Sequence, residues 1–597
     1  MAIFMPAQTE TLNRRDIFPE IDLPNVSTLL TEAKAIGPIL GGCPFLQHQS
    51  VSSEYQYKQR QAANGHIMLH GQIGYRSLQQ SVRAYREIHE QLGEQGYGID
   101  RYGLCLDWSM GYAEQDRQER ARGTGLILGH ADEFLELTDS APVAPHFGDF
   151  VMGMPAALEN TRNALKAGAT SIGNLGQYFT FRLPDYDDDV FITAQTIKAI
   201  ALCAQQPVPI IVHSNLDDGF AALFSDMTCA LGAVMLEQTV VEDLLGGVTG
   251  HCFGHTYSEP LTRLAFGIAL TKNSKHPGTM IYGNTTSYEA ELSGNFASLA
   301  NYLGVDIMLQ RLYPSGHAIN PVPVTEAIRI PSIAEVVEAH LFANRMISHS
   351  PGMQPLIDVQ EAENLAEKIL IGGRQFHANV LNGLAQSGID TGNPFEMLLA
   401  MRRIGARKLE KLYGPGKLID SEQRQPVVES TTLRDIRRHA RSFTSCISAE
   451  TRQILLDKNL TICTVTTDVH EYGKILLEHV FSDLDIKIVD GGVCTDPDDL
   501  AELAHNQGVD VIAISTYNGV ALNYIQELKK NLHIKGISYI PVYIGGKLNQ
   551  VSDEANSSDL PVDVQPQLEA MGAIPCTDID EMLSLLGNPQ SISKPHR

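Results

Sequence analysis

The stretch LTICTVTTDVHEYG occupies residues 460–473 and joins a strand-like run to a polar turn. Residues 460–465 form a largely apolar run, which is typical of a parallel strand covered on both faces. Asp468, His470 and Gly473 follow directly, where that strand should end. Because ligands of parallel sheets bind beyond the carboxyl ends of the strands, the stretch predicts an α/β domain with a ligand site at this turn.

Further strand and helix patterns follow this stretch toward the C-terminus. Strands are expected at 486–490, 509–514, 540–544 and 572–576. Helices are expected at 473–482, 497–506, 520–532 and 578–586, and Asp496 and Pro497 suit the start of the second of them. The alternation predicts a doubly wound, flavodoxin-like (Rossmann-type) domain over residues 456–597.

The turn after the first of these strands has the chemistry of a metal ligand. The imidazole of His470 can extend one ring nitrogen outward to a metal. The carboxylate of Asp468 can accept a hydrogen bond from the other ring nitrogen, which fixes the tautomer and raises the basicity of the imidazole. Gly473 lets a bulky group approach the start of the helix. A D-x-H-x-x-G run alone is weak evidence, because it also occurs by chance.

Two later strand ends strengthen the pattern, since Ser515 follows the third strand and Gly545 and Gly546 follow the fourth. Together with the D-x-H-x-x-G run, they resemble the cobalamin-binding domain of B12-dependent mutases and methionine synthase. The resemblance implies that His470 is the axial ligand to cobalt in place of the vitamin's own base, with Asp468 as its partner. It also implies that Ser515 contacts the detached base and that the two glycines line the nucleotide tail.

One position departs from that family, which usually has the pattern S-x-L after the third strand, whereas this chain has Tyr517. We expect Tyr517 to reshape the tail pocket and to leave the ligand pair unchanged. The alternative interpretation is a flavodoxin-like domain with an incidental histidine, and the three matching strand ends count against it.

The middle of the chain, residues 61–350, alternates short apolar runs with helical patterns. Strands are expected at 66–70, 103–107, 142–146, 170–174, 209–213, 248–252, 279–283 and 306–310. Helices are expected between them, among others at 77–92, 156–167, 190–204, 217–233 and 262–271. Strands that alternate with helices in this way predict a (β/α)8 TIM-type barrel that forms the substrate domain, and the alternative is an open α/β sheet. Residues 1–60 are expected to be an irregular extension or cap, and residues 351–455 a helical segment and linker.

In such a barrel the chemistry lies at the carboxyl ends of the strands, and the side chains expected there are unusually polar. The candidates for substrate binding are His70, Gln72, Asp107, His146, Asn174, Gln177, Arg182 and Gln310. The candidates for general acid–base roles are His213, His251 and Tyr178. Each histidine alone is more often a hydrogen-bonded core residue, so the hypothesis depends on their convergence at one barrel mouth.

The expected barrel resembles the large chain of glutamate mutase, more remotely than the C-terminal domain resembles its family. The segments that carry this resemblance are 171–178, 306–310 and 316–327. Fusion of both parts in one chain resembles 2-methyleneglutarate mutase and methylmalonyl-CoA mutase. The resemblance implies an isomerase with adenosylcobalamin as cofactor, which catalyses a radical 1,2-rearrangement of the carbon skeleton of a small carboxylic or amino acid.

The substrate of glutamate mutase is gripped by arginines, whereas this chain has Gln72 and His146 at the corresponding strand ends. A bidentate carboxylate clamp needs the guanidinium fork, so glutamate itself is not expected as the substrate. The nearby candidates for binding a single carboxylate are Arg76, Arg182 and Arg311. A corrinoid-dependent methyltransferase and a non-catalytic B12-binding sensor are the alternative functions. The helical pattern before the C-terminal domain favours the former, and the lack of a zinc-binding cysteine cluster in the sequence counts against it.

The composition limits the remaining function classes. The chain has 597 residues, enough for two to four domains at roughly 100–250 residues each. A net charge of −25 argues against a nucleic-acid partner, and the nine scattered cysteines fit reduced thiols in a cytoplasm. The sequence has no apolar run of about 18 residues, so no membrane partner is expected. We therefore expect a cytoplasmic protein that binds a small-molecule substrate, and the family resemblance adds a homodimer.

Overall fold

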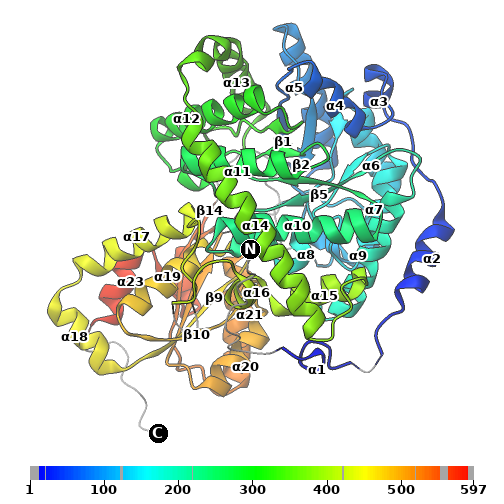
Figure 1. The fold of residues 1–597 in the computed structure, drawn as a ribbon. Coiled ribbons are helices and arrows are strands. Elements are labelled where there is room, and N and C mark those ends of the chain that lie inside the picture. The colour runs from blue at the N-terminus through cyan, green and yellow to red at the C-terminus, as the bar shows by residue number, and fades with distance from the viewer. Residues whose placement is uncertain are drawn as a thin grey trace. The chain divides into compact units, whose positions relative to one another are not determined.

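The computed structural model describes residues 12–20, 22–120, 125–217, 219–419, 423–468, 470–517, 519–550 and 562–588 (Figure 1). Residues 1–11 of the expected N-terminal extension lie outside this part. The chain divides into two compact units. The first comprises Met1–Ala121, Gly125–Thr180 and Asp188–Thr431, and the second comprises Arg122–Thr124, Phe181–Asp187 and Thr432–Arg597. Parallel sheets occur in both units, which confirms the predicted α/β class.

Among its described residues, the second unit contains one five-stranded parallel sheet. Its strands, in spatial order, are β10 (Lys487–Asp490), β9 (Thr461–Thr466), β11 (Val511–Thr516), β12 (Val542–Gly546) and β15 (Ile574–Cys576). Numbered along the chain this order is 2-1-3-4-5, the flavodoxin-like arrangement that the sequence predicts. Each strand lies within two residues of its predicted range. The structure adds a short antiparallel pair, β13 (Asn549–Gln550) and β14 (Val562–Asp563), which the sequence analysis missed.

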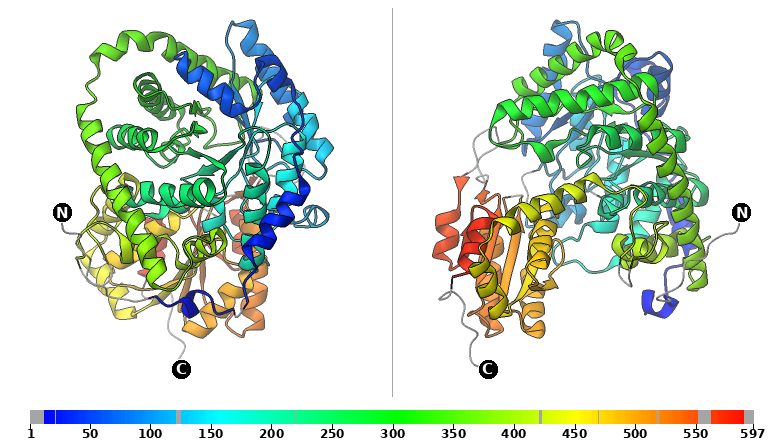
Figure 2. Two further views of the ribbon diagram at one scale, coloured as in Figure 1. Left: turned by 45° about the vertical axis from the view of Figure 1, so that its right-hand side comes forward. Right: turned by 60° about the vertical axis from the view of Figure 1, so that its left-hand side comes forward.

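Helices cover both faces of this sheet (Figure 2). Those that contribute to the two apolar layers are α17 (Thr431–Cys446), α18 (Ala449–Lys458), α19 (Tyr472–Asp483), α20 (Pro497–Gln507), α21 (Ala521–Ile534), α22 (Gln565–Ala570) and α23 (Ile579–Leu586). Successive side chains of β11 alternate between the layers: Ile512 and Ile514 pack in one, Val511 and Ala513 in the other. Burial on both faces explains why β9 and β11 appear in the sequence as largely apolar runs.

Eight short parallel strands lie in the described part of the first unit. They are β1 (His70–Ile73), β2 (Arg101–Leu104), β3 (Ala144–Pro145), β4 (Ser171–Ile172), β5 (Ile211–Asn215), β6 (Val248–Cys252), β7 (Met280–Ile281) and β8 (Ala318–Ile319). Ladders join β1-β2-β3, β4-β5-β6 and β7-β8. Isolated parallel bridges join Phe147 to Ile172, Phe253 to Ile281 and Leu69 to Ile319. Each strand is thus linked to the next along the chain, and the eighth is linked to the residue preceding the first; we call these strands the strand ring.

The predicted eighth strand is wrong. Residues 306–310 lie in helix α12 (Leu292–Leu312), and β8 begins eight residues after that range. The run DIMLQ is too short for its apolar pattern to distinguish a strand from a buried helical turn. The preceding buried positions decide the matter, because Leu299, Leu303 and Ile307 recur at the four-residue spacing of one helix face.

Helices account for most of the remaining first unit. The N-terminal region contains α1 (Arg14–Ile17), α2 (Val26–Ile36), α3 (Pro44–Gln49) and α4 (Glu54–Ala63), so the expectation of an irregular extension is wrong. The helices that follow the strands include α5 (Leu78–Glu94), α7 (Ala157–Lys166), α9 (Asp189–Ala204), α10 (Met227–Gln238) and α11 (Pro260–Asn273). The region after the strand ring is helical, as expected, with α13 (Ile333–Met353), α14 (Gln360–Gln386), α15 (Pro394–Ile404) and α16 (Ala406–Tyr413). Within the described ranges, we find no helix with the length and apolar character needed to cross a membrane.

A buried ion pair joins α11 to α12 and generates a first prediction. Arg263 Nε and Nη2 donate to the two carboxylate oxygens of Asp306 at 2.7 and 2.6 Å, and both side chains are almost fully buried. Asp306→Ala leaves the guanidinium buried without its counter-charge, so the free energy of unfolding should fall by about 3–5 kcal/mol. Urea unfolding followed by the fluorescence of Trp108, the single tryptophan, measures this change in the first unit.

Glu87→Ala is the control for this prediction, because it removes the exposed α5 ion pair between Arg83 and Glu87. Exposed pairs contribute little to stability, so this variant should unfold like the unaltered protein. An Asp306→Ala variant that unfolds at the same urea concentration as Glu87→Ala would contradict the prediction.

Candidate functional site

The turn after β9 in the second unit brings Asp468 and His470 together as the sequence predicts. Asp468 Oδ1 accepts hydrogen bonds from His470 Nδ1 at 2.7 Å and from the His470 backbone N–H at 2.9 Å. The Asp468 side chain is buried, whereas about a third of the His470 side chain is exposed, at 33%. Because the Nδ1–H group donates a hydrogen bond to the carboxylate, Nε2 carries no proton and its lone pair can bind a metal.

The second oxygen of Asp468 fixes the carboxylate to the neighbouring strand end. Oδ2 accepts a hydrogen bond from the Tyr517 backbone N–H at 2.8 Å and one from Thr467 Oγ1 at 3.3 Å. Burial alone would raise the pKa of the Asp468 carboxyl, but the hydrogen bonds with His470 and Tyr517 outweigh burial and hold that pKa below its usual range. The carboxylate is therefore ionised at neutral pH and held from two strand ends.

Glycines make close approaches possible around this turn. A Cβ at Gly473 would lie 2.3 Å from Ser515 Oγ, so the absence of a side chain there lets the helix start meet β11. A Cβ at Gly546 would lie 2.1 Å from the Thr516 carbonyl oxygen, and its φ of +109° also favours glycine. At Gly545 the nearest atom would be 3.4 Å away, so that position does not require glycine in this structure. Gly473, Ser515 and Gly546 thus gather at one edge of the sheet, as the sequence predicts.

Tyr517 and Lys547 complete the surroundings of His470. The ring centroids of Tyr517 and His470 are 4.4 Å apart with an angle of 36° between the planes. Lys547 Nζ lies 4.2 Å from the Tyr517 ring centroid and donates to the Tyr517 hydroxyl at 3.1 Å. Lys547 was not among the predicted site residues, although its place directly after the glycine pair at a strand end could have indicated it.

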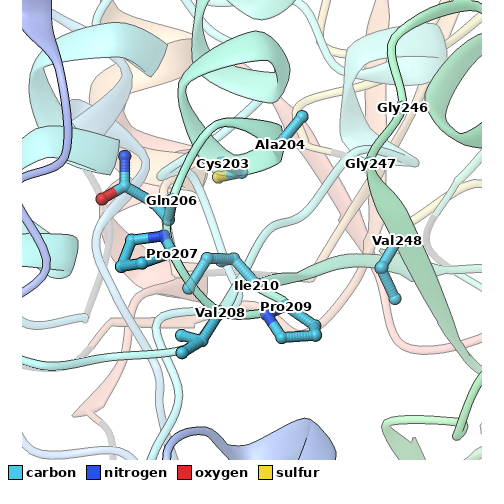
Figure 3. Close-up of a pocket in the computed structure, with 10 residues that line it drawn as sticks. All are labelled: Cys203, Ala204, Gln206, Pro207, Val208, Pro209, Ile210, Gly246, Gly247 and Val248. Carbon is cyan, nitrogen blue, oxygen red and sulfur yellow. The ribbon is translucent and has the colours of Figure 1, made fainter.

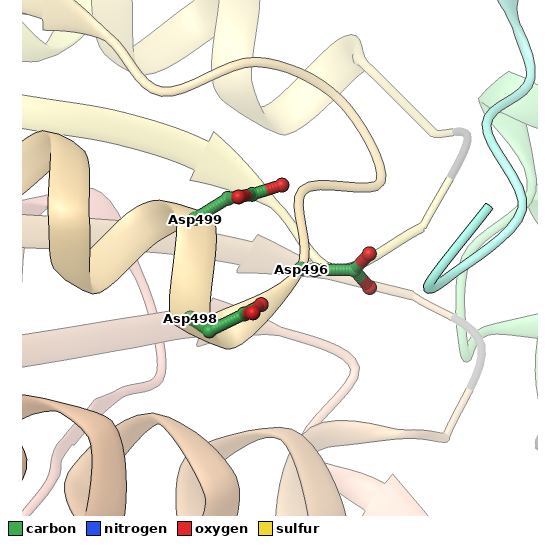
Figure 4. A group of neighbouring side chains, drawn as sticks. All are labelled: Asp496, Asp498 and Asp499. Atoms are coloured by element: carbon green, nitrogen blue, oxygen red, sulfur yellow. The ribbon is translucent and has the colours of Figure 1, made fainter. Parts of the chain in front are cut away.

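Three carboxylates lie together at the start of α20: Asp496, Asp498 and Asp499 (Figure 4). Asp496 precedes the helix and accepts a hydrogen bond from the Asp185 backbone N–H at 2.8 Å, within the second unit. Partial burial, followed by the charge of Asp498, raises the pKa of Asp499. Acidic side chains at a helix N-terminus interact favourably with the helix dipole, and this interaction explains why three carboxylates lie at the start of α20.

In the first unit, three of the predicted histidines form a buried row across the strand ring. The ring centroids of His70 and His146 are 6.4 Å apart, and those of His146 and His213 are 4.5 Å apart. Burial, and after it the charge of Arg101, holds the pKa of all three well below the usual range. The three imidazoles are therefore neutral at neutral pH.

Hydrogen bonds orient this row. His146 Nδ1 lies 3.2 Å from the Ser171 carbonyl oxygen, to which it donates, and His213 Nδ1 lies 2.9 Å from Thr279 Oγ1. His70 Nδ1 accepts from Arg101 Nη1 at 3.2 Å, and its Nε2 donates to Gln72 Oε1 at 3.0 Å. The row and Gln72 thus form one connected polar group inside the first unit.

Asn174 lies at the carboxyl end of β4, close to this group. Its Oδ1 accepts from the Gly176 and Asn215 backbone N–H groups at 2.9 and 2.8 Å. Its Nδ2 is buried and has no hydrogen-bond partner among the described residues. A buried amide N–H without a partner is costly, so this group is a candidate donor to a bound molecule.

The predicted acid–base candidate His251 points elsewhere. In the register of β5 and β6, His213 is paired with Gly250, whereas His251 is paired with Ser214. Ser214 Oγ and His251 Nε2 both lie within hydrogen-bond distance of Glu237 on α10, at 3.1 and 2.9 Å. Since side chains alternate along a strand, His251 lies on the helix-facing side and His213 on the opposite side.

Several other predicted side chains are bound to elements around the ring. The Tyr178 hydroxyl lies 2.6 Å from Thr193 Oγ1 on α9. Gln177 Oε1 accepts from the Phe150 backbone N–H at 2.9 Å, and Asp107 Oδ1 caps a short helix through the Ser109 backbone N–H at 2.8 Å. These contacts stabilise the loops after the strands.

Three further candidates are not members of the row of histidines. Gln310 is not at a strand end, because it lies on α12 and donates to Ser315 Oγ at 2.8 Å. Arg311 donates a hydrogen bond to Ser350 Oγ, and this contact links α12 to α13. Arg182 is exposed and belongs to the second unit, whereas the other substrate-binding candidates belong to the first.

The sequence analysis missed the buried charges beside the histidine row. Arg101 Nε donates to Glu54 Oε1 at 2.8 Å, and its Nη2 donates to Ser171 Oγ at 2.9 Å. Lys58 Nζ donates to the carbonyl oxygens of Thr279 and Gly316 at 2.8 and 2.9 Å, and burial lowers its pKa to about 8. Glu54 and Lys58 come from α4, so the expectation of an irregular segment hid their contribution.

A surface hollow of the first unit lies next to the starts of β5 and β6 (Figure 3). Its lining residues are Cys203, Ala204, Gln206, Pro207, Val208, Pro209, Ile210, Gly246, Gly247 and Val248. They precede β5 and β6 or begin them, whereas the polar strand ends lie at the opposite ends of these strands. The hollow carries no ionisable cluster and is not part of the candidate site.

Comparisons with known proteins agree with the geometry of the second unit. The family model described as "B12 binding domain" matches residues 459–570. The glutamate mutase sigma subunit of Escherichia coli O157:H7 is 25% identical over 133 residues, which are 22% of this chain and 85% of that protein. The glutamate mutase sigma subunit of Clostridium tetanomorphum is 25% identical over 138 residues, covering 22% of this chain and 96% of that one.

A solved structure of a novel cobalamin-binding protein from Desulfitobacterium hafniense DCB-2 also matches, with 17% identity and a TM-score of 0.17. The match covers 21% of this chain and 55% of that protein. The family match spans β9, β10, β11 and β12 and includes Asp468 and His470. Residues 459–570 therefore form a B12-binding domain.

Proposed function

We propose that this protein is an adenosylcobalamin-dependent mutase that rearranges the carbon skeleton of a small carboxylic or amino acid. The observation that carries the proposal is the hydrogen bond between Asp468 and His470 at the end of β9, which leaves Nε2 of the imidazole for cobalt. The similarity to glutamate mutase sigma subunits supports the choice of a mutase.

The residues of the second unit fit a cobalamin. A neutral imidazole with a buried carboxylate behind it is a suitable axial ligand, because the carboxylate fixes the tautomer and raises the basicity of the free nitrogen. By the family resemblance, Ser515, Gly545 and Gly546 would hold the detached nucleotide base and tail. When bound, adenosylcobalamin would supply the carbon-centred radical that starts the rearrangement.

We assign the first unit as a (β/α)8 barrel that binds the substrate. Support comes from the parallel links around the strand ring, which run in chain order and return from β8 to the residue before β1. Chemistry in such barrels lies at the carboxyl ends of the strands. Of the predicted residues, we propose Gln72, His146, Asn174 and His213 as candidates for contacts with the substrate.

The proposed roles of these side chains follow from their protonation states. The neutral imidazole of His146 can accept a hydrogen bond or a proton from the substrate at Nε2, because its other nitrogen donates to the Ser171 carbonyl oxygen. The buried Nδ2 of Asn174 can donate to a substrate oxygen. Neither the Asn174 amide nor the Gln72 amide provides the guanidinium clamp of a dicarboxylate site. We therefore propose a substrate other than glutamate.

His470→Ala provides the direct test of cobalt ligation. The side chain lies in a partly exposed turn, so the variant should remain folded. It should bind cobalamin more weakly and lose the spectrum of histidine-ligated cobalt, measured by titration with cobalamin and absorbance. Asp468→Asn keeps the ligand but removes its charged partner, and its affinity should fall by about 10- to 100-fold.

His505→Ala is the matched control for ligation, because His505 is an exposed histidine of α20 in the same unit. It should bind like the unaltered protein. Persistence of a histidine-ligated cobalt spectrum in His470→Ala would show that another residue is the ligand.

Hydrogen exchange tests the reaction class. Protein loaded with adenosylcobalamin that carries deuterium at the 5′ carbon is incubated with a panel of small carboxylic and amino acids. A mutase should transfer deuterium to its substrate, because hydrogen moves between substrate and cofactor in each turnover; mass spectrometry measures the label. Methyl transfer from methylcobalamin without exchange would indicate a methyltransferase, and a light-dependent change of assembly without turnover would indicate a sensor; either result would contradict the proposal.

A further inference from the structure

Three side chains from three neighbouring strand ends form a stack in the second unit: Lys547, Tyr517 and His470. The Lys547 ammonium lies 4.2 Å from the centroid of the Tyr517 ring, and the His470 ring centroid lies 4.4 Å from the same ring. They follow β12, β11 and β9, which are adjacent in the sheet. We call this group the Lys547–Tyr517–His470 stack.

The Lys547–Tyr517–His470 stack restrains a rotation of the His470 imidazole that its hydrogen bond to the Asp468 carboxylate leaves possible. The hydrogen bond from His470 Nδ1 to Asp468 fixes the direction of one ring edge, but the imidazole can still rotate about the line that joins the two atoms. A planar group against the ring opposes that rotation. Tyr517 supplies such a group, because its ring centroid lies 4.4 Å from that of His470 with an angle of 36° between the planes.

The position of the Tyr517 ring is itself determined from two sides. Its backbone N–H donates to Asp468 Oδ2 at 2.8 Å, so the residue is tied to the same carboxylate that orients His470. Lys547 Nζ contacts the ring as a cation and also donates to the phenolic oxygen at 3.1 Å. A leucine, the residue usual in the related family, would provide neither the flat face nor the hydroxyl.

We propose that Tyr517, held by Lys547, is a positioning residue that sets the plane of the His470 imidazole before cobalamin binds. The inference rests on the proposed role of His470 as the cobalt ligand. It assigns Tyr517 a role toward the ligand, whereas the sequence analysis expected an effect on the tail pocket alone. Preorganisation of this kind raises the fraction of bound corrin whose cobalt is coordinated by histidine, because less freedom is lost on coordination.

The test uses the full chain labelled with ¹⁵N-histidine and loaded with cobalt(II) cobalamin. The splitting that one ¹⁵N nucleus adds to the cobalt signal in electron paramagnetic resonance measures the fraction of cobalt coordinated by histidine. Tyr517→Leu should lower the ratio of coordinated to uncoordinated cobalt by about 2- to 10-fold, the factor that corresponds to one aromatic contact. Tyr517→Phe keeps the flat face but loses the hydrogen bond with Lys547, so it should lower the ratio less than Tyr517→Leu does, and Lys547→Met should also lower it less than Tyr517→Leu.

Matched controls are Tyr539→Leu and Lys530→Met, which alter exposed side chains of the same unit. Both should give the unaltered ratio. A Tyr517→Leu variant with an unchanged ratio would overturn the inference. An unchanged ratio together with a lower total affinity for cobalamin would indicate that Tyr517 acts in the tail pocket, and it would overturn the inference as well. Failure of the proposed function gives a different result: the unaltered protein itself would bind cobalamin without any ¹⁵N splitting.

Discussion

The hydrogen bond between the buried carboxylate of Asp468 and the imidazole of His470 is the interaction on which the candidate cofactor site depends. Both residues lie between the end of β9 at Thr466 and the start of α19 at Tyr472, where Asp468 Oδ1 accepts a hydrogen bond from His470 Nδ1. The backbone N–H of Tyr517 holds the second carboxylate oxygen, which ties the turn to β11. The ligand geometry is therefore a consequence of the order of strands in the sheet.

The strands and helices of the second unit could be predicted closely from the sequence, because each follows from a short pattern of neighbouring residues that recurs along the unit. Strands that are buried on both faces appear as continuous apolar runs, and Asp496 and Pro497 fit the start of α20. The same reasoning failed at residues 306–310, where an apolar run is one face of a long helix. It also missed α1 to α4. The largely polar sequence of α4 hides Glu54 and Lys58, which bind other parts of the first unit.

Side-chain direction was the harder part of the candidate site. Polar residues at strand ends could be found from the pattern, but a shift of one position along a strand moves a side chain to the other face. His213 and His251 illustrate this limit, since the register of β5 and β6 places them on opposite sides. Hydrogen bonds from Tyr178 to Thr193 and from Gln310 to Ser315 depend on helices distant from any motif, so only the structure reveals them. Lys547 was overlooked because it contributes through contact with an aromatic ring and not through a recognised ligand type.

A crystal structure of the chain with cobalamin is the most direct measurement of the central claim. Ligation of cobalt by His470 predicts continuous density between His470 Nε2 and cobalt, with the dimethylbenzimidazole base detached from the metal and Asp468 still hydrogen-bonded to Nδ1. Density that shows the base coordinated to cobalt, with His470 turned away, would contradict it.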